Sequence, residues 1–399
     1  MAPIGTTNAS IAAFFWLFMF AVSLPPKWAS LHLAGIALVI SVGFAQRSDW
    51  RSPAVRTYLL CTALWMIPVL LTAVLQHALG VASATDWTKL LALVLRTFGI
   101  GLGIIVLVQR GWLSLYSATV ALLCALAIHA GAGLIDWMTT SKTYLEETGR
   151  QFGVHGLVFN ANPFGMFMAM AAILSVGLLR DQPRRAALWV LLFAAMFCVW
   201  VSESRGAILI TAAGLAVLFP PNNRKRLLTY LGGGVLLASV YLYATLHSPL
   251  FYGASDSARM IALSFALEKI RMAPWIGWGI DAYEHFPDRV GPNAPHNMWL
   301  DLAVSSGLVA VAGALQSVAL LATRLYRRRQ PAAQMALAMF VAALVAGSLE
   351  YSILDSTHFR GLWVLVVALA CCTLNERCGA HEATHRAESP VANLNQPFA

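Results

Sequence analysis

The stretch PHNMWLD, residues 295–301, stands where the longest polar segment of the sequence meets an apolar run. The polar segment covers residues 247–294, and the apolar run covers residues 295–323. Pro295 suits the first turn of a helix, because proline lacks the N–H group that a helix start leaves without an intrahelical partner. The boundary therefore predicts a long apolar helix that begins here and carries His296 in its first turn.

The composition excludes a soluble globular protein. Of the 399 residues, 59% are hydrophobic and 11% are charged, whereas soluble domains are charged at about 25% of positions. Apolar runs of this length cross a bilayer as helices, which satisfy their own backbone hydrogen bonds. We therefore expect an all-α polytopic membrane protein.

Twelve apolar runs are bounded by turn or charge signals and predict twelve transmembrane helices with one long periplasmic loop, residues 247–294. The runs cover residues 10–24, 31–45, 57–75, 88–108, 112–130, 158–179, 186–202, 206–220, 227–246, 295–323, 334–349 and 361–375. Residues 1–375 form a single predicted transmembrane domain, and residues 376–399 a polar, disordered cytoplasmic tail.

The net charge of +9 comes mainly from arginine and lysine clusters in alternate loops. Those loops hold Arg47, Arg51, Arg56, Arg110, Arg180, Arg184, Arg185, Arg224, Lys225, Arg226, Arg324, Arg327, Arg328 and Arg329. Clusters in alternate loops follow the positive-inside rule and place these loops and both termini in the cytoplasm. The basic residues therefore give no reason to expect nucleic acid, and the six cysteines show neither metal nor disulfide spacing.

The long loop contains one amphipathic segment. From Ser257 to Met272, apolar residues recur at helical spacing among charged ones, which predicts an interfacial helix on the outer membrane surface. Ala273-Pro274 ends the segment, and Ile276–Gly279 predicts a turn.

Two arginines on the outer side are not explained by topology. Arg205 follows Ser204 at a predicted helix start, and Arg259 follows Ser255 or Asp256, either of which could cap a helix. The helix dipole opposes a cation in the first turn unless an anion lies near. The alternative is that each arginine extends its charge to lipid headgroups.

Further polar residues suit the same face. Asn160 and Asn162 precede a predicted span, with Asn162 as N-cap and Pro163 as first helical residue, and capping alone would explain them. Arg96 lies within a span, roughly 10 Å below the outer surface, where a charge needs a partner. Arginines and helix starts bind phosphate, so the cluster predicts an outward-facing site for a diphosphate-bearing lipid.

Acidic residues at metal-binding spacing are scarce on this face. Glu146 and Glu147 lie beside Lys142 and Arg150, and Asp301 is off the helical face of His296. We therefore expect no metal and no other cofactor, so that the arginines supply the charge stabilisation.

The stretch around residue 296 resembles the O-antigen ligase (WaaL) family. The family pattern of His-Asn, nine residues and Gly is matched by His296, Asn297 and Gly307. The family's usual Gly, Thr or Tyr three residues later is Ala310 here, a departure at an expected packing position.

Three other elements of the family pattern occur in the right order. They are Ser204–Ala207, the segment from Arg259 to Pro274–Gly279, and Gly156–Phe164, although Gly153 replaces an arginine often found before the last element. The resemblance covers about residues 150–320. It implies a periplasmic-face glycosyltransferase of the Gram-negative inner membrane, which moves a glycan from undecaprenyl diphosphate to an acceptor.

The close match at His296 favours lipid A–core as the acceptor, with membrane lipids as surroundings. We hypothesise a metal-independent, inverting transfer in which Arg205 and Arg259 bind the diphosphate and His296 acts as general base. The expected substrate-binding residues are Arg96, Asn160, Asn162, Asn297 and Arg360.

Three alternatives remain open. An O-antigen polymerase would use a second carrier-linked glycan as acceptor, and a protein-glycosylating ligase is expected to be longer. A transporter or flippase of lipid-linked glycans would fit the composition, but repeated halves are absent from the sequence. The roles of Asp355, His358 and Arg360, in the last outer loop, are also open.

Overall fold

The structure is a computed structural model that describes residues 47–80, 87–139, 154–158, 160–219, 254–280, 282–286, 295–351, 354 and 357–374. Within these ranges the chain forms helices and turns and no strand. The predicted all-α class is confirmed for this part of the chain.

The helices follow one another with short connections. They are α3 (Arg47–Trp50), α4 (Pro53–Ala78), α5 (Trp87–Leu95), the π-helical η1 (Arg96–Ile100), α6 (Gly101–Gln109), α7 (Leu115–Thr139), the 3₁₀ turn η2 (Gly156–Val158), α9 (Ala161–Asp181), α10 (Ala186–Val201), α11 (Arg205–Leu218), α13 (Ala254–Met272), α14 (Ala282–His285), α15 (Met298–Tyr326), α16 (Pro331–Leu349) and α17 (Thr357–Cys372).

Six described helical segments are long and apolar enough to cross a membrane, with α5, η1 and α6 counted as one segment. The others are α4, α7, α9, α15 and α16, and the shorter apolar helices are α10, α11 and most of α17. The chain is therefore an integral membrane protein. The predicted spans over residues 10–24, 31–45 and 227–246 and the tail over 376–399 lie outside the described residues, so the total of twelve stays a prediction.

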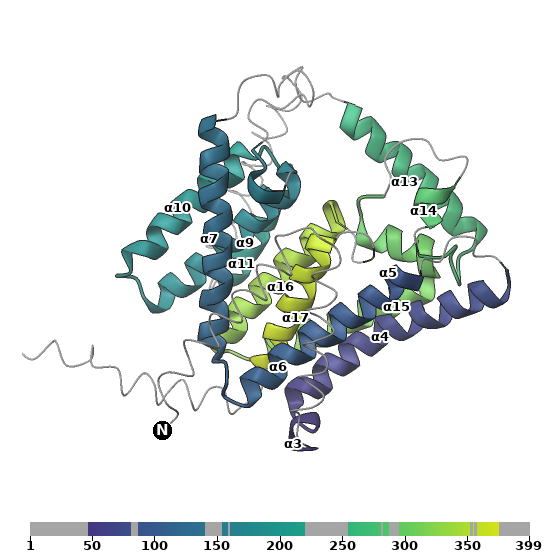
Figure 1. The fold of residues 1–399 in the computed structure, drawn as a ribbon, viewed down its shortest axis with the longest axis horizontal. Coiled ribbons are helices and arrows are strands. Elements are labelled where there is room, and N and C mark those ends of the chain that lie inside the picture. Colours follow the sequence, from purple (N-terminus) through teal and green to yellow (C-terminus); the bar gives the residue numbers. More distant parts are fainter. Residues whose placement is uncertain are drawn as a thin grey trace, which may run out of the picture.

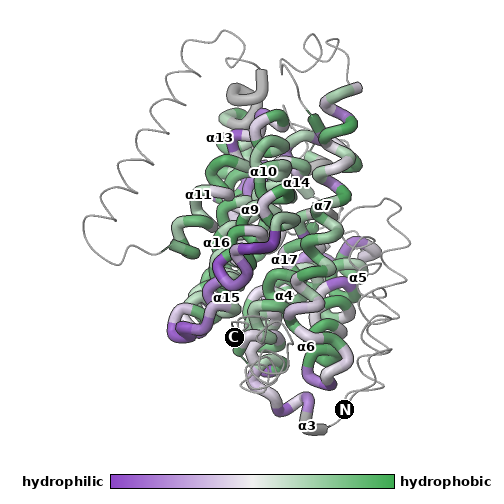
Figure 2. Tube along the Cα trace, turned by 90° about the vertical axis from the view of Figure 1, so that its left-hand side faces the viewer, coloured by the Kyte–Doolittle hydropathy of each residue, from purple (hydrophilic) through white to green (hydrophobic). Residues whose placement is uncertain are grey.

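Arginines tie neighbouring helix ends together at one end of the molecule. The contacts join Arg110 to Asp49, Arg180 to the carbonyl of Leu218, Arg324 to Thr57, and Arg328 to the carbonyl of Leu374. All four arginines come from the basic clusters, and hydrophilic residues mark the end of α15 in Figure 2. Helices therefore alternate in direction, and the starts of α9, α11, α15 and α17 share the opposite end, which we call the outer end.

Two helices occupy the centre of the molecule. Helices α16 and α17 lie between a group formed by α7, α9, α10 and α11 and a group formed by α4, α5, α6 and α15 (Figure 1). Helix α16 contacts α9 and α11, whereas α17 contacts α4 and α6. The outer end of α16 is thus placed where helices from both groups begin.

Helices α4 and α15 pack with their backbones in close contact. A Cβ atom on Gly313 would lie only 1.9 Å from the carbonyl oxygen of Leu64. Small residues allow such approaches between membrane helices, where van der Waals packing replaces the hydrophobic effect. Ala310, on the same helix, is completely buried in the core, so its predicted packing role is confirmed.

Candidate functional site

Helix α15 begins against the outer end of α16. Asn297 is its N-cap: its side-chain oxygen accepts from the N–H groups of Trp299 (2.9 Å) and Leu300 (3.1 Å). The Asn297 amide donates to the carbonyl of Ser348 at 2.6 Å, and the Trp299 indole donates to the Ser348 hydroxyl at 2.9 Å. The asparagine of the His-Asn pair therefore caps one helix and fastens it to another.

His296 lies immediately before this N-cap. We predicted it in the first helical turn, which is wrong, because α15 starts at Met298. Its φ of +50° is in the left-handed region, which non-glycine residues seldom adopt and which concentrates at functional sites. The side chain is half-buried, and the capped helix start holds its backbone in place.

Helix α11 begins with the predicted arginine. The Ser204 hydroxyl caps the helix by accepting from the N–H of Ala207 at 3.3 Å, and Arg205 is the first helical residue. Glu203, in the preceding turn, has φ +51°. Next to Arg205, a Cβ atom on Gly206 would lie 3.1 Å from Cγ of Glu350, so the start of α11 rests against the end of α16.

Helix α9 begins beside the same glutamate. Asn160, rather than Asn162, is the N-cap, and its side chain accepts from the N–H of Asn162 at 2.9 Å. The predicted cap was thus two residues too late, because Ala161 is already helical. The Asn162 amide group instead donates to Oε2 of Glu350 at 2.9 Å.

Glu350 joins these motifs, although the sequence prediction did not include it. It is the C-cap of α16 and is only 7% exposed. The starts of α9 and α11 contact its side chain, and the start of α15 is fastened two residues earlier at Ser348. A single acid at the outer end of an apolar run was the available signal, but such an acid is also common at a membrane surface.

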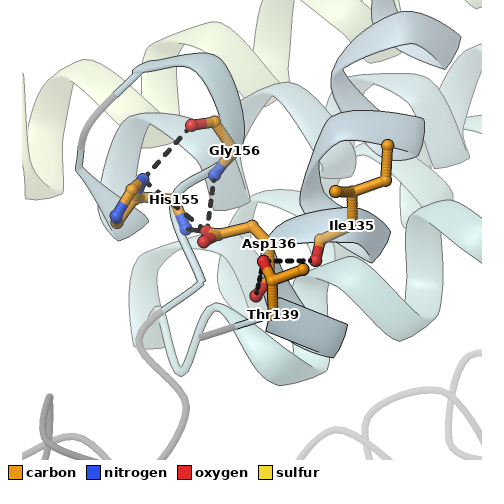
Figure 3. Close-up of polar contacts among 5 residues, drawn as sticks. All are labelled: Ile135, Asp136, Thr139, His155 and Gly156. Atoms are coloured by element: carbon orange, nitrogen blue, oxygen red, sulfur yellow. Dashed lines mark hydrogen bonds and ion pairs between the residues drawn. The ribbon is translucent and has the colours of Figure 1, made fainter. Parts of the chain in front are cut away.

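The turn that leads into α9 is held by Asp136, near the end of α7. Its Oδ2 accepts from the backbone N–H groups of His155 (2.9 Å) and Gly156 (3.1 Å) and lies 3.6 Å from Nδ1 of His155 (Figure 3). Gly156 has φ +52°, and Phe164 fills the space that side chains on Gly156 and Gly133 would need. The glycine of the family element is therefore explained by geometry.

Helix α15 is broken at Gly307, where the sequence predicted an uninterrupted helix. Gly307 has φ +79°, and a Cβ atom there would lie 2.1 Å from the carbonyl oxygen of Trp275. Gly277 has φ +65°, and its Cβ would lie 2.6 Å from the backbone of Val304–Ser306. Only residues without side chains allow these two backbones to touch.

The loop over residues 274–279 supplies the hydrogen bonds that the break removes. The N–H groups of Trp278 and Gly279 donate to the carbonyls of Val304 (2.8 Å) and Ser305 (2.9 Å), and Leu308 donates to Pro274 (2.7 Å). The buried amide of Gln76, from α4, also donates to the Ser305 carbonyl at 2.9 Å. Two motif elements that are distant in sequence therefore form one structural unit.

The predicted interfacial helix is α13, and it packs on the first half of α15. Ala262 and Ala266 are buried in a cluster with Val304 and Tyr283. Lys269 is also buried, with Nζ 4.8 Å from the ring of Phe265. This aromatic contact gives one outer-face cation, which topology does not explain, a structural place.

Arg259 lies on α13, and its side chain is outside the described residues. Because α13 starts at Ala254, Ser255 and Asp256 are helical residues. The predicted first-turn position of Arg259 is therefore wrong, and it lies in the second turn. The helix is nevertheless linked to the break in α15 through the docked loop.

Arg96 and Arg360 are buried apart from these contacts. Arg96 begins the π-helical η1 within its span, where the Tyr58 hydroxyl donates to the Thr97 carbonyl at 2.6 Å. Arg360 donates to the carbonyl of Leu354 at the start of α17, and η1 packs on α17. Asp355 and the side chain of His358 are outside the described residues.

Within the described residues, no three His, Cys, Asp or Glu side chains are grouped as metal ligands would be. The polar atoms gathered at the outer end of α16 are instead backbone donors, amides, the Arg205 side chain, one imidazole and one carboxylate. Arginine and helix starts favour an anion, and imidazole can accept a proton near neutral pH.

Comparison with known families agrees with the motifs. The family model described as O-antigen ligase matches residues 189–315, from α10 to the second half of α15. The match contains Arg205, Arg259, the loop 274–279 and His296. No curated protein matches the chain. The family predicted from the sequence is confirmed, and it indicates a membrane enzyme of O-antigen ligase or polymerase type.

Proposed function

We propose, for a protein whose residues 189–315 belong to the O-antigen ligase family, that it transfers O-antigen polysaccharide from undecaprenyl diphosphate to lipid A–core. The site faces the periplasm, in an inner-membrane protein with both termini in the cytoplasm. Residues 1–375 form the transmembrane domain, and the loop 247–294 lies on the periplasmic side. The orientation rests on the basic clusters at the end opposite His296.

In the proposed reaction, an acceptor hydroxyl oxygen attacks the anomeric carbon of the donor glycan. The bond between that carbon and the diphosphate oxygen breaks, and undecaprenyl diphosphate leaves with the bonding electrons. His296 takes the hydroxyl proton, and Arg205 and Arg259 bind the diphosphate as its charge develops. Direct attack inverts the anomeric centre, and no metal takes part.

One observation carries this proposal: the helix starts that bear His296 and Arg205 meet at residues 348–350. A base and an anion-binding cation therefore share one small region at the outer end, as transfer from a diphosphate requires. Asn297, Asn160 and Asn162 shape this region, and their further contacts to substrate are part of the proposal, as are those of Arg96 and Arg360.

The direct test uses the purified protein in detergent with an undecaprenyl-diphosphate-linked glycan and lipid A–core. We expect glycosylated lipid A–core to accumulate at the same rate with and without a chelator. A transporter requires a sealed membrane and forms no new bond, so transfer in detergent also distinguishes these classes. Absence of product with both substrates present would contradict the proposal.

The nearest alternative is an O-antigen polymerase, whose acceptor is another carrier-linked glycan. A strain that lacks the gene distinguishes the two. Loss of a ligase leaves O-antigen of normal length on the carrier, whereas loss of a polymerase leaves lipopolysaccharide with a single repeat unit. We expect the first result.

Arg205→Lys tests the diphosphate contact. Lysine keeps the positive charge but cannot form two parallel hydrogen bonds to phosphate. Since a charge-assisted hydrogen bond contributes about 1.5–3 kcal/mol, we expect kcat/KM for the donor to fall by about 10- to 100-fold. The measurement is initial rate against donor concentration.

Arg185→Lys is the matched control. Arg185 lies at the opposite end of the molecule, where it donates to the hydroxyl of Tyr116, and its exchange should leave transfer unchanged. Wild-type kinetics for Arg205→Lys would mean that Arg205 serves only as a membrane-surface charge.

A further inference from the structure

Glu350 is a buried carboxylate whose charge is matched by its surroundings. Burying a carboxylate is costly unless hydrogen bonds or opposite charge compensate. Here the side chain accepts from the amide of Asn162 at 2.9 Å and lies against Gly206. Both contacts are in the first turns of helices, where the helix dipole is positive. The position of this side chain is therefore well defined.

The end of α16 thus carries two anchors that are two residues apart. Ser348 holds the start of α15 through Asn297 and Trp299. Glu350 holds the starts of α9 and α11. His296 precedes the first of these helix starts, and Arg205 belongs to the last. The separation of the base and the arginine is therefore fixed by residues 348–350.

We infer that Glu350 is a positioning residue for glycan transfer, which holds the helix start bearing Arg205 in register with the helix start bearing His296. This inference rests on the proposed function. Glu350 acts through the helices it contacts, since its side chain is committed to Asn162 and Gly206. Loss of its contacts should therefore disturb the reacting geometry more than the affinity for the donor.

The expected signature is a split between kcat and KM. Glu350→Ala removes both contacts, and a misplacement of about 1 Å can lower a rate by about 100-fold. We expect kcat to fall by about that factor, with donor KM changed by less than about threefold, because the arginines that bind the diphosphate remain. Glu350→Gln keeps the shape and an oxygen that accepts from Asn162, so it should recover kcat to within about 10-fold of wild type.

A double-mutant cycle with Asn162→Ala provides the decisive measurement. If Glu350 acts through Asn162, the single substitutions share one effect, and the double variant should be little worse than Glu350→Ala alone. Asn162→Ala alone should lower kcat by about 10-fold. Glu268→Gln, which changes an exposed glutamate of α13, is the control and should retain full activity.

The outcomes separate the two proposals. Wild-type protein that transfers glycan while Glu350→Ala or Asn162→Ala keeps wild-type kcat would overturn the positioning role alone. Independent, multiplicative effects in the cycle would do the same. If Glu350→Ala fails to accumulate in the membrane, the cycle is measured with Glu350→Gln and Asn162→Ala. Wild-type protein without transfer activity would instead reject the proposed function, and the positioning role with it.

Discussion

Replacing His296 by alanine is expected to lower the rate of glycan transfer by about 10²- to 10⁴-fold, the contribution typical of a general base. Methyl cannot accept the proton of the acceptor hydroxyl, so that oxygen remains a weak nucleophile. The measurement is the initial rate of transfer by purified protein with both substrates saturating. Donor binding should persist, because Arg205 and Arg259 are unchanged.

His296→Asn separates the chemistry from the backbone. His296 has φ +50°, and asparagine adopts left-handed geometry more readily than alanine. We therefore expect the asparagine variant to keep the thermal stability of the wild type in detergent, yet to be as slow as the alanine variant. An asparagine variant that transfers glycan at near-wild-type rates would remove His296 as the base.

Gly307→Ala is expected to lower the free energy of unfolding by about 3 kcal/mol or more. A side chain at positive φ costs about 1–3 kcal/mol, and overpacking adds about 1–3 kcal/mol. The added Cβ would lie 2.1 Å from the carbonyl oxygen of Trp275, a backbone atom that no rotamer change can move. The measurement is thermal unfolding in detergent, together with transfer activity at low temperature.

Gly131→Ala is the matched control for this effect. Gly131 lies within α7, with nothing inside 4 Å of the position that its Cβ would take. Alanine should be neutral or slightly stabilising there, since glycine is a poor residue within helices. If Gly307→Ala melts with Gly131→Ala and the wild type, the close contact between residues 275 and 307 is not formed in the protein.

Sequence patterns located the described helices to within a few residues, because apolar runs and their polar ends are local properties. The span predicted over residues 57–75 is α4, and that over 334–349 is α16. Caps were less accurate. Asn160 and Asn162 are both good capping residues, so composition could not decide which of them ends the preceding turn.

The features that sequence could not give depend on contacts between distant segments. The break at Gly307 lies in a run of small and apolar residues, and it becomes necessary only because the loop 274–279 docks there. The importance of Glu350 likewise comes from Asn162 and Gly206, which precede it by far in the chain. Arg205 was found from sequence because its signal, a cation at a helix start, is local.

The docked loop also imposes an order on assembly in the bilayer. Alone in hydrocarbon, α15 would have to satisfy the carbonyls of Val304 and Ser305 itself, since each unpaired backbone group costs several kcal/mol there. The bend becomes affordable only when Trp278 and Gly279 deliver their N–H groups, and these residues leave the ribosome before α15. Docking of the earlier segment is therefore a checkpoint that α15 must pass before it can bend.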